Sequence, residues 1–237
     1  MMRRLWRAIR SVVLWTVGAL WMAPMMALMT VLGWALGPRA IDGLSRVYCR
    51  GQVALTGSRW RAVVDPAVDP NATYLFVQNH VNLLDHVTMY DATPHFKQGV
   101  ELEAHFRIPF YGWFMRSRGT IPVRPGGGRE FAERVQSEVA KGNSILAFPE
   151  GTRTRTGAVG PFRKGMFRVA RDAGVAVVPV AVRGMFDVNR PNSWHLNPGD
   201  VTVYVLAPVP TEGVSDASLQ ALADDVRARI VQRLEAP

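Results

Sequence analysis

TYLFVQNHVNLLD, residues 73–85, changes from mainly apolar to polar residues half-way along. Its first part is a short apolar run, which is typical of a strand buried on both faces of a sheet. The polar residues Gln78-Asn79-His80 end that run, and a helical stretch begins near Leu84. We therefore expect His80 at the carboxyl end of a strand and Asp85 in the first turn of a helix. Open α/β sheets build their functional sites at that edge.

Short β-rich runs and helical windows also alternate along the rest of the chain after Pro38. Such alternation predicts the α/β class, with a mainly parallel or mixed central sheet flanked by helices. Ser215 is expected to cap the last helix, in which apolar residues recur at helical spacing. The further predicted strands are 119–123, 144–148, 175–180 and 201–206, and the other predicted helices are 129–141 and 162–172.

The N-terminal part of the chain has the composition of a membrane segment. No charged side chain occurs from Ser11 to Leu36, and a bilayer needs about 20 apolar residues. Pro24 interrupts the run, and a proline inside a helix removes a hydrogen bond and kinks or breaks it. We therefore expect a membrane-associated helical segment at residues 1–44, folded as a two-helix hairpin, and one α/β domain at residues 45–237. A single span and a cleaved signal peptide are the alternatives.

Arginines flank the apolar run on both sides, which places both of its ends on the cytoplasmic face of the cell membrane. The whole chain has 28 basic and 19 acidic residues, and 25 of the basic ones are arginine. This excess favours a phosphate-bearing or anionic partner, such as an anionic membrane surface, over a plain basic surface. Nucleic acid is disfavoured because aromatic residues do not interleave with the arginines. Cys49 is the only cysteine, so an intrachain disulfide and a Cys-rich metal site are excluded, and we expect no metal site.

A histidine followed five positions later by an aspartate could supply a base and the carboxylate that orients it, but this spacing occurs three times. Five residues of a continuous helix turn through about 500°, which leaves the two side chains roughly 140° apart. His80 and Asp85 have a break between them and can converge. His86 and Asp91 share one helix and should diverge, and Asp200, five residues after His195, is expected to be a turn residue.

A second polar segment, FPEGTR at residues 148–153, follows the strand predicted at 144–148. Gly151 allows a tight turn, and Thr152 and Arg153 can donate hydrogen bonds to a phosphate. Each part also has a plainer interpretation. Gly151 could be an ordinary turn residue, and Glu150 could merely pair with a nearby arginine.

Together these two segments resemble the glycerolipid acyltransferase family, which includes the lysophosphatidate acyltransferases. The likeness extends through IPFYGW at 108–113, GTIPV at 119–123, FRKG at 162–165 and VPV at 178–180, and it covers roughly residues 70–183. The resemblance implies that His80 is a general base oriented by Asp85. It also implies that Glu150, Gly151, Thr152, Arg153 and Arg124 contact the acceptor.

The implied reaction transfers a fatty acyl group from acyl-CoA or acyl carrier protein to the sn-2 hydroxyl of 1-acylglycerol 3-phosphate, with no further cofactor. The hydroxyl of the substrate would be the nucleophile, because the chain has no Gly-x-Ser-x-Gly elbow and Cys49 has no histidine near it in sequence. Three alternatives remain open: acylation of another lysolipid such as a lyso-aminolipid, hydrolysis of acyl-CoA, and non-enzymatic binding of anionic lipid.

Two departures from the family pattern concern the acceptor. Pro125 stands where family members commonly have an arginine, so Arg124 reaches the phosphate by a shifted backbone or not at all. Glu103-Ala104 replaces a frequent Lys-Glu pair. The headgroup is therefore less firmly predicted than the chemistry, and Arg163 and Lys164 are further candidates to bind phosphate.

Overall fold

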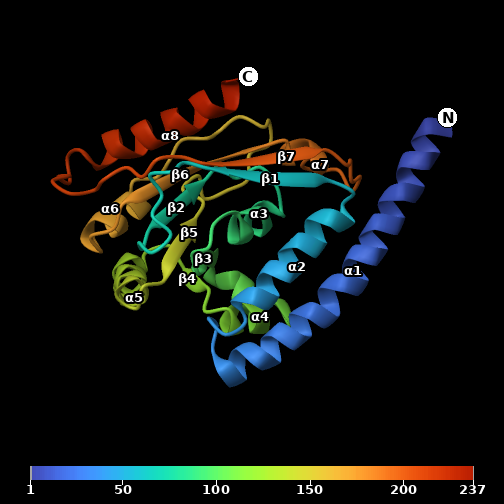
Figure 1. The fold of residues 1–237 in the computed structure, drawn as a ribbon, viewed down its shortest axis with the longest axis horizontal. Helices are drawn as coiled ribbons and strands as arrows, with labels where there is room; N and C mark the ends of the chain where they lie inside the picture. The colour runs from blue at the N-terminus through green and yellow to red at the C-terminus, as the bar shows by residue number, and fades with distance from the viewer. Residues whose placement is uncertain (1, 237) are drawn as a thin grey trace.

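The computed structural model describes residues 2–236, in which seven strands form one sheet in the order β1-β7-β6-β2-β5-β3-β4 (Figure 1). Every neighbouring pair of strands is parallel except β6 with β7. The predicted α/β class with a mainly parallel, mixed sheet is thus confirmed. The strands are β1 Arg59–Val64, β2 Leu75–Gln78, β3 Lys97–Leu102, β4 Ile121–Val123, β5 Ser144–Ala147, β6 Val177–Arg183 and β7 Asp200–Val205.

Helices cover both faces of the sheet. Helices α5, α6 and α8 pack on one face, and α3 and α7 pack on the other. Helices α1, α2 and α4 form a further apolar cluster at the side of α3. The helices are α1 Met2–Leu36, α2 Asp42–Leu55, α3 Asp85–Ala92, α4 Tyr111–Ser117, α5 Gly128–Ala140, α6 Gly165–Asp172, α7 Met185–Val188 and α8 Leu219–Glu235, with a 3-10 turn η1 at Glu103–Arg107.

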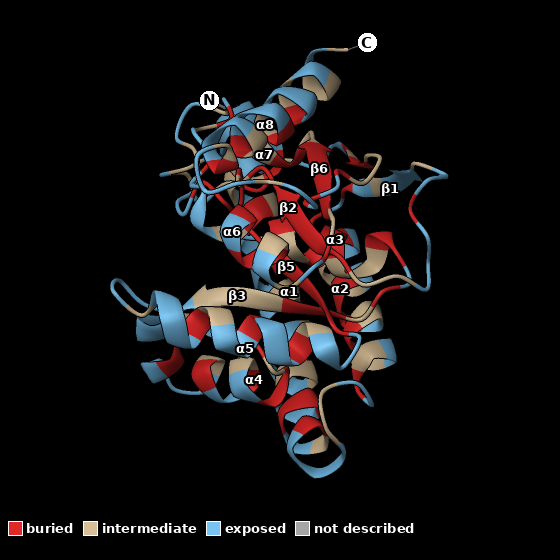
Figure 2. Cartoon of the chain, turned by 90° about the vertical axis from the view of Figure 1, so that its left-hand side faces the viewer, coloured by how far each residue is buried: buried red, intermediate tan, exposed pale blue. Residues whose placement is uncertain are grey.

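The two central strands β2 and β5 are the most enclosed part of the fold (Figure 2). Phe76 and Leu146 face the side of α3, whereas Leu75 and Ile145 face the side of α5 and α6. Burying each such side chain contributes about 1.5–3 kcal/mol to the stability of the fold. The loops that follow β2 and β5 therefore begin at a rigid part of the fold.

Two strands, β1 and β3, do not appear among the sequence predictions. Strand β1 is an exposed edge with arginines on it, so it lacks the apolar run of a buried strand. Strand β3 begins with the buried Lys97, whose ammonium group donates to the carbonyls of Thr93 (3.2 Å) and His95 (3.1 Å). Helix α8 begins at Leu219, after a turn in which Ser215 and Ser218 exchange side-chain to backbone hydrogen bonds.

The predicted two-helix hairpin within residues 1–44 is wrong, because α1 is a single helix of 35 residues that continues through Pro24. An interior proline costs a helix about 3 kcal/mol. Here packing on both sides of Pro24 offsets that cost. Ser11 is buried in the first half, and Met29 and Gly33 are buried in the second.

Helix α1 lies along the rest of the molecule instead of projecting from it. A Cβ atom added to Gly33 would lie 2.7 Å from the backbone oxygen of Ser117 at the end of α4, so the two helices touch there. Most of the remaining surface of α1 is exposed and apolar, and the helix is long and apolar enough to cross a membrane. The chain reverses at Gly37 and enters α2, and the boundary expected after residue 44 falls inside α2.

Candidate active site

His80 and Asp85 meet at the carboxyl end of β2. The chain leaves β2 at Gln78, turns through residues 79–84 and enters α3 at Asp85. This turn brings the imidazole Nδ1 of His80 to 2.8 Å from Oδ2 of Asp85. The same carboxylate oxygen accepts hydrogen bonds from the backbone N–H groups of Val81 (2.5 Å) and Asn82 (2.7 Å). The structure therefore brings together the pair that a continuous helix would have separated.

The environments of the two side chains suit a base and its orienting partner. Asp85 is fully buried, while 22% of the His80 side chain is exposed. Burial raises the pKa of the Asp85 carboxyl, and the hydrogen bond and charge of His80 oppose that shift, as do the two backbone N–H groups. With the Nδ1 proton donated to Asp85, the other ring nitrogen, Nε2, can accept a proton. The Phe148 ring stacks on the imidazole, with 4.1 Å between centroids, and fixes its plane.

Glu150 holds the backbone of His80 in place. Its Oε1 accepts the backbone N–H of His80 at 2.7 Å, and its Oε2 accepts the N–H of Gly160 at 2.8 Å. The carbonyl of His80 accepts the N–H of Thr154 at 2.8 Å. Burial raises the pKa of Glu150, and the hydrogen bonds from the His80 and Gly160 backbones act against that shift. Both backbone groups of His80 are thus bound by the segment that follows β5.

Replacing Glu150 by glutamine should lower kcat about 10- to 100-fold, because one of the two acceptor oxygens becomes an amide donor facing a backbone N–H. We expect a loss of about 1–3 kcal/mol of stability as well. Steady-state kinetics and thermal unfolding would measure both effects. Glu133→Gln, the same change at an exposed position on α5, is the matched control. Equal kcat values for the two variants would contradict the role of Glu150.

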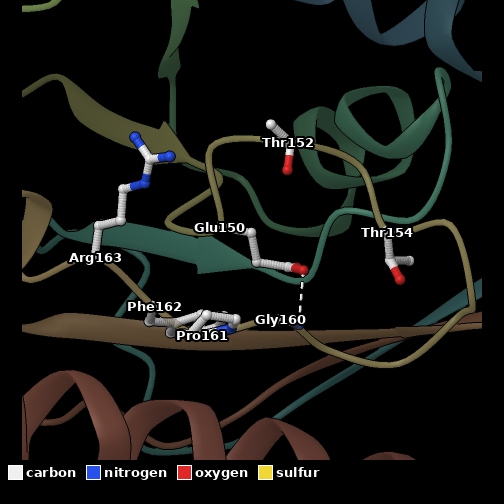
Figure 3. A pocket seen from close by; sticks show the side chains of 7 residues that line it. All are labelled: Glu150, Thr152, Thr154, Gly160, Pro161, Phe162 and Arg163. Atoms are coloured by element: carbon white, nitrogen blue, oxygen red, sulfur yellow. Dashed lines mark hydrogen bonds between the residues drawn. The ribbon is translucent and has the colours of Figure 1, made fainter.

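A cavity of about 370 Å³ lies beside Glu150. It is lined by Glu150, Thr152, Thr154, Gly160, Pro161, Phe162 and Arg163, and Figure 3 shows these side chains around it. The Arg163 guanidinium packs close to Gly151, whose φ of 73° favours glycine. Arg163 was one of the further candidates from the sequence, and it is the arginine that lines the cavity.

The predicted substrate-binding residues fall into two groups. Gly151, Thr152 and Arg153 follow Glu150 directly, and Arg153 is exposed. Arg124 lies at the end of the edge strand β4, two places from β5 in the sheet order. Its guanidinium is 2.7 Å from a carboxylate oxygen of Glu130 and 4.0 Å from one of Glu103. The structure does not bring Arg124 to the cavity.

In the other two His-x4-Asp sequences, the aspartate binds an arginine and not the histidine. Asp91 binds the Arg50 guanidinium at 2.6 Å, and Asp200 binds Arg59 at 3.0 Å. His195 lies 3.5 Å from the hydroxyl of Ser11. In the described part of the chain, only His80 pairs with the aspartate five residues after it.

Several residues of the site have roles that the sequence did not predict. The Asn79 side chain accepts the N–H of Val182 at 2.8 Å and donates to the carbonyl of the same residue at 3.2 Å, which ties the end of β2 to β6. Gly160 and Thr154 have no sequence signal, because their contacts depend on how the loop after β5 folds back. Within residues 2–236 no group of three metal-ligating side chains gathers.

Comparisons with known proteins show the family of the chain. Residues 61–183, about half of the chain, match the acyltransferase family. The chain belongs to the acyltransferase family. A chloroplastic 1-acyl-sn-glycerol-3-phosphate acyltransferase of Brassica napus is 32% identical over 164 residues, which are 68% of this acyltransferase and 46% of the relative. The alpha form of the human 1-acyl-sn-glycerol-3-phosphate acyltransferase is 30% identical over 67% of this chain and 57% of its own length.

This acyltransferase spans about half the length of the curated relatives that it matches. The fold also matches the crystal structure of the 1-acyl-sn-glycerophosphate acyltransferase PlsC from Thermotoga maritima, with a TM-score of 0.83 over 99% of this chain and 98% of that one. The identity between the two is 19%, so this likeness concerns the fold alone.

Proposed function

We propose that this acyltransferase transfers a fatty acyl group from acyl-CoA or acyl carrier protein to the sn-2 hydroxyl of 1-acylglycerol 3-phosphate, giving phosphatidate. The observation that carries the proposal is the 2.8 Å contact between Nδ1 of His80 and Oδ2 of Asp85, beside a cavity lined by Arg163. The similarity to 1-acyl-sn-glycerol-3-phosphate acyltransferases supports the choice of acceptor.

In the proposed mechanism, Nε2 of His80 takes the hydroxyl proton as the acceptor oxygen attacks the thioester carbonyl. Asp85 holds the imidazole in the required tautomer and stabilises the imidazolium that forms, as the carboxylate does in a serine-protease triad. When the tetrahedral intermediate collapses, the carbon–sulfur bond breaks, and the thiol takes the proton back from His80. No acyl-enzyme is needed, because the nucleophile belongs to the acceptor.

Arg153 and Arg163 are the proposed ligands of the acceptor phosphate. Neither guanidinium forms an ion pair within residues 2–236, so both retain hydrogen-bonding capacity for an anion. Thr152 adds a hydroxyl donor at the wall of the cavity. Arginine suits this role because its planar guanidinium can bind a phosphate through two parallel hydrogen bonds.

Replacing Arg153 by alanine should raise KM for 1-acylglycerol 3-phosphate about 10- to 100-fold, which corresponds to the roughly 1.5–3 kcal/mol of a charged hydrogen bond. The KM for an uncharged monoacylglycerol should change little. Arg155→Ala, two positions along the same loop, removes another exposed arginine and is the control. An equal rise in KM for the charged and the uncharged acceptor would contradict phosphate binding by Arg153.

Acylation of another lysolipid, such as a lyso-aminolipid, is the second candidate. The pairing of Arg124 with Glu103 and Glu130 favours it, because a cation expected near the acceptor is already neutralised. The deciding experiment supplies purified enzyme with labelled acyl-CoA and a panel of lysolipids. We expect phosphatidate as the main product. A different acylated product would identify the other acceptor, and release of thiol without any acceptor would indicate hydrolysis.

The exposed apolar face of α1 suggests where the reaction takes place. We propose that α1 lies in the membrane and holds the active site near the cytoplasmic surface, where lysolipid and acyl donor meet. Arg3, Arg4 and Arg7 are exposed at the start of α1 and suit an anionic lipid surface. Membrane attachment alone would also serve a non-enzymatic lipid-binding protein, but that role leaves the His80–Asp85 pair without a function.

A further inference from the structure

Asn82 lies between the two catalytic candidates and is buried, with 2% of its surface exposed. Its backbone N–H donates to Oδ2 of Asp85 at 2.7 Å. Its side-chain amide donates to the carbonyls of Met185 (2.8 Å) and Asn189 (3.2 Å), and its Oδ1 accepts the N–H of Leu84 at 2.9 Å. One residue therefore joins the Asp85 carboxylate to α7 and to the start of the loop that follows it.

The loop after α7, residues 189–197, is itself held together by Asn189. The Asn189 side chain donates to the carbonyls of Ser193 (2.8 Å) and His195 (3.3 Å). The N–H of Asn197 donates to the carbonyl of Val188 at 2.8 Å, which closes the loop at its end. The loop thus has a fixed shape where it leaves Asn82.

Helix α1 supports the far side of this loop. The N–H of Leu196 donates to the hydroxyl of Ser11 at 3.1 Å, and the indole N–H of Trp15 donates to the carbonyl of Trp194 at 2.7 Å. Ser11 is completely buried although most of α1 is exposed. Hydrogen bonds, joined by short segments of backbone, therefore link α1 through residues 189–196 and Asn82 to Asp85.

We propose that Asn82 is a positioning residue for the His80–Asp85 pair, and that α1 supports this position through the 189–197 loop. The inference rests on the proposed roles of His80 and Asp85. An aligned base must hold its geometry closely, since a displacement of about 1 Å can cost about 10²-fold in rate. The membrane helix would then contribute to the rate of the chemical step in addition to attachment.

The test compares the full-length enzyme with three variants along this path, using 1-acylglycerol 3-phosphate and labelled acyl-CoA in lipid–detergent micelles. We expect kcat to fall about 10- to 100-fold for Asn82→Ala, less for Asn189→Ala, and about 3- to 10-fold for Trp15→Phe. The KM values for both substrates should stay near those of the parent. A change in KM would indicate altered substrate binding instead of positioning.

Trp6→Phe is the matched control for Trp15→Phe. It makes the same change on an exposed residue of α1 whose side chain forms no hydrogen bond within residues 2–236. Micelle binding should be equal for Trp15→Phe and Trp6→Phe, and the thermal unfolding temperature of Trp15→Phe should be only slightly lower, because it loses the single hydrogen bond to Trp194. If their kcat values are also equal, the role of α1 is refuted. If Asn82→Ala folds and retains the parent kcat, the whole proposal is refuted.

His80→Ala in the same assay separates this proposal from the proposed mechanism. Residual turnover by His80→Ala would refute the general-base role, and with it the need for positioning. An inactive His80→Ala beside a fully active Asn82→Ala would refute the positioning proposal and leave the proposed mechanism intact.

Discussion

Acyl transfer falls about 10²- to 10⁴-fold when His80 is replaced by alanine, which is our expected result for the loss of a positioned general base. The hydroxyl of the acceptor must lose its proton as it attacks, and no other base within residues 2–236 combines an exposed ring edge with a contact to a buried carboxylate. The fold should survive, because the Glu150 and Thr154 hydrogen bonds involve only the backbone of His80. Transfer of labelled acyl groups to lysolipid in single-turnover reactions would measure the loss directly.

The control for His80 is His86→Gln, which changes the histidine of α3, the next histidine along the chain that also precedes an aspartate by five positions. His86 is partly buried, and burial lowers its pKa to about 4. His86 therefore stays neutral at ordinary pH, and Asp91, five residues after it, is bound to Arg50. We expect His86→Gln to keep most of the parent kcat. Substantial turnover by folded His80→Ala would refute the mechanism.

Asp85→Asn is expected to lower kcat about 10³- to 10⁴-fold, the scale seen when the carboxylate of a catalytic triad becomes an amide. The amide oxygen of the new side chain can keep the hydrogen bonds from His80, Val81 and Asn82, but it carries no negative charge to stabilise the imidazolium. KM should change little, because Asp85 is buried beneath His80 and is not among the residues that line the cavity.

The stability of Asp85→Asn should stay close to that of the parent or rise. Burial raises the pKa of Asp85, so the negative charge is costly in the folded state, and one of its oxygens, Oδ1, has no hydrogen-bond partner. An activity loss without a stability loss would separate a catalytic role from a structural one. Thermal unfolding at neutral pH is the measurement.

Asp91→Asn provides the matched comparison at the other end of α3. Asp91 is also buried at its side chain but binds Arg50 and lies within 4 Å of Arg46. We therefore expect a loss of stability with kcat nearly unchanged, the reverse of the Asp85→Asn result. If both variants lose stability and activity in parallel, the orienting role of Asp85 is refuted.

Local sequence was sufficient to predict the helices and strands whose burial is uniform. The apolar runs of β2, β5 and β6 and the periodicity of α5 and α8 follow from short-range patterns. It was insufficient for β1 and β3, where arginines, a buried lysine and a glycine obscure the strand pattern. It also failed at Pro24, because the intrinsic cost of a proline is local while the packing that offsets it comes from α2, α4 and the loop near Trp194.

The sequence by itself determined the pairing of His80 with Asp85, since both residues and the break between them lie within seven positions of the chain. Tertiary structure alone decided that Glu150 binds the backbone of His80, that Arg163 lines the cavity and that Arg124 is held by Glu103 and Glu130. It also decided that Asn82 links the site to α1. Most of these contacts join residues tens of positions apart. They depend on the order of strands in the sheet and on how the loops cross its carboxyl edge, which no local pattern encodes.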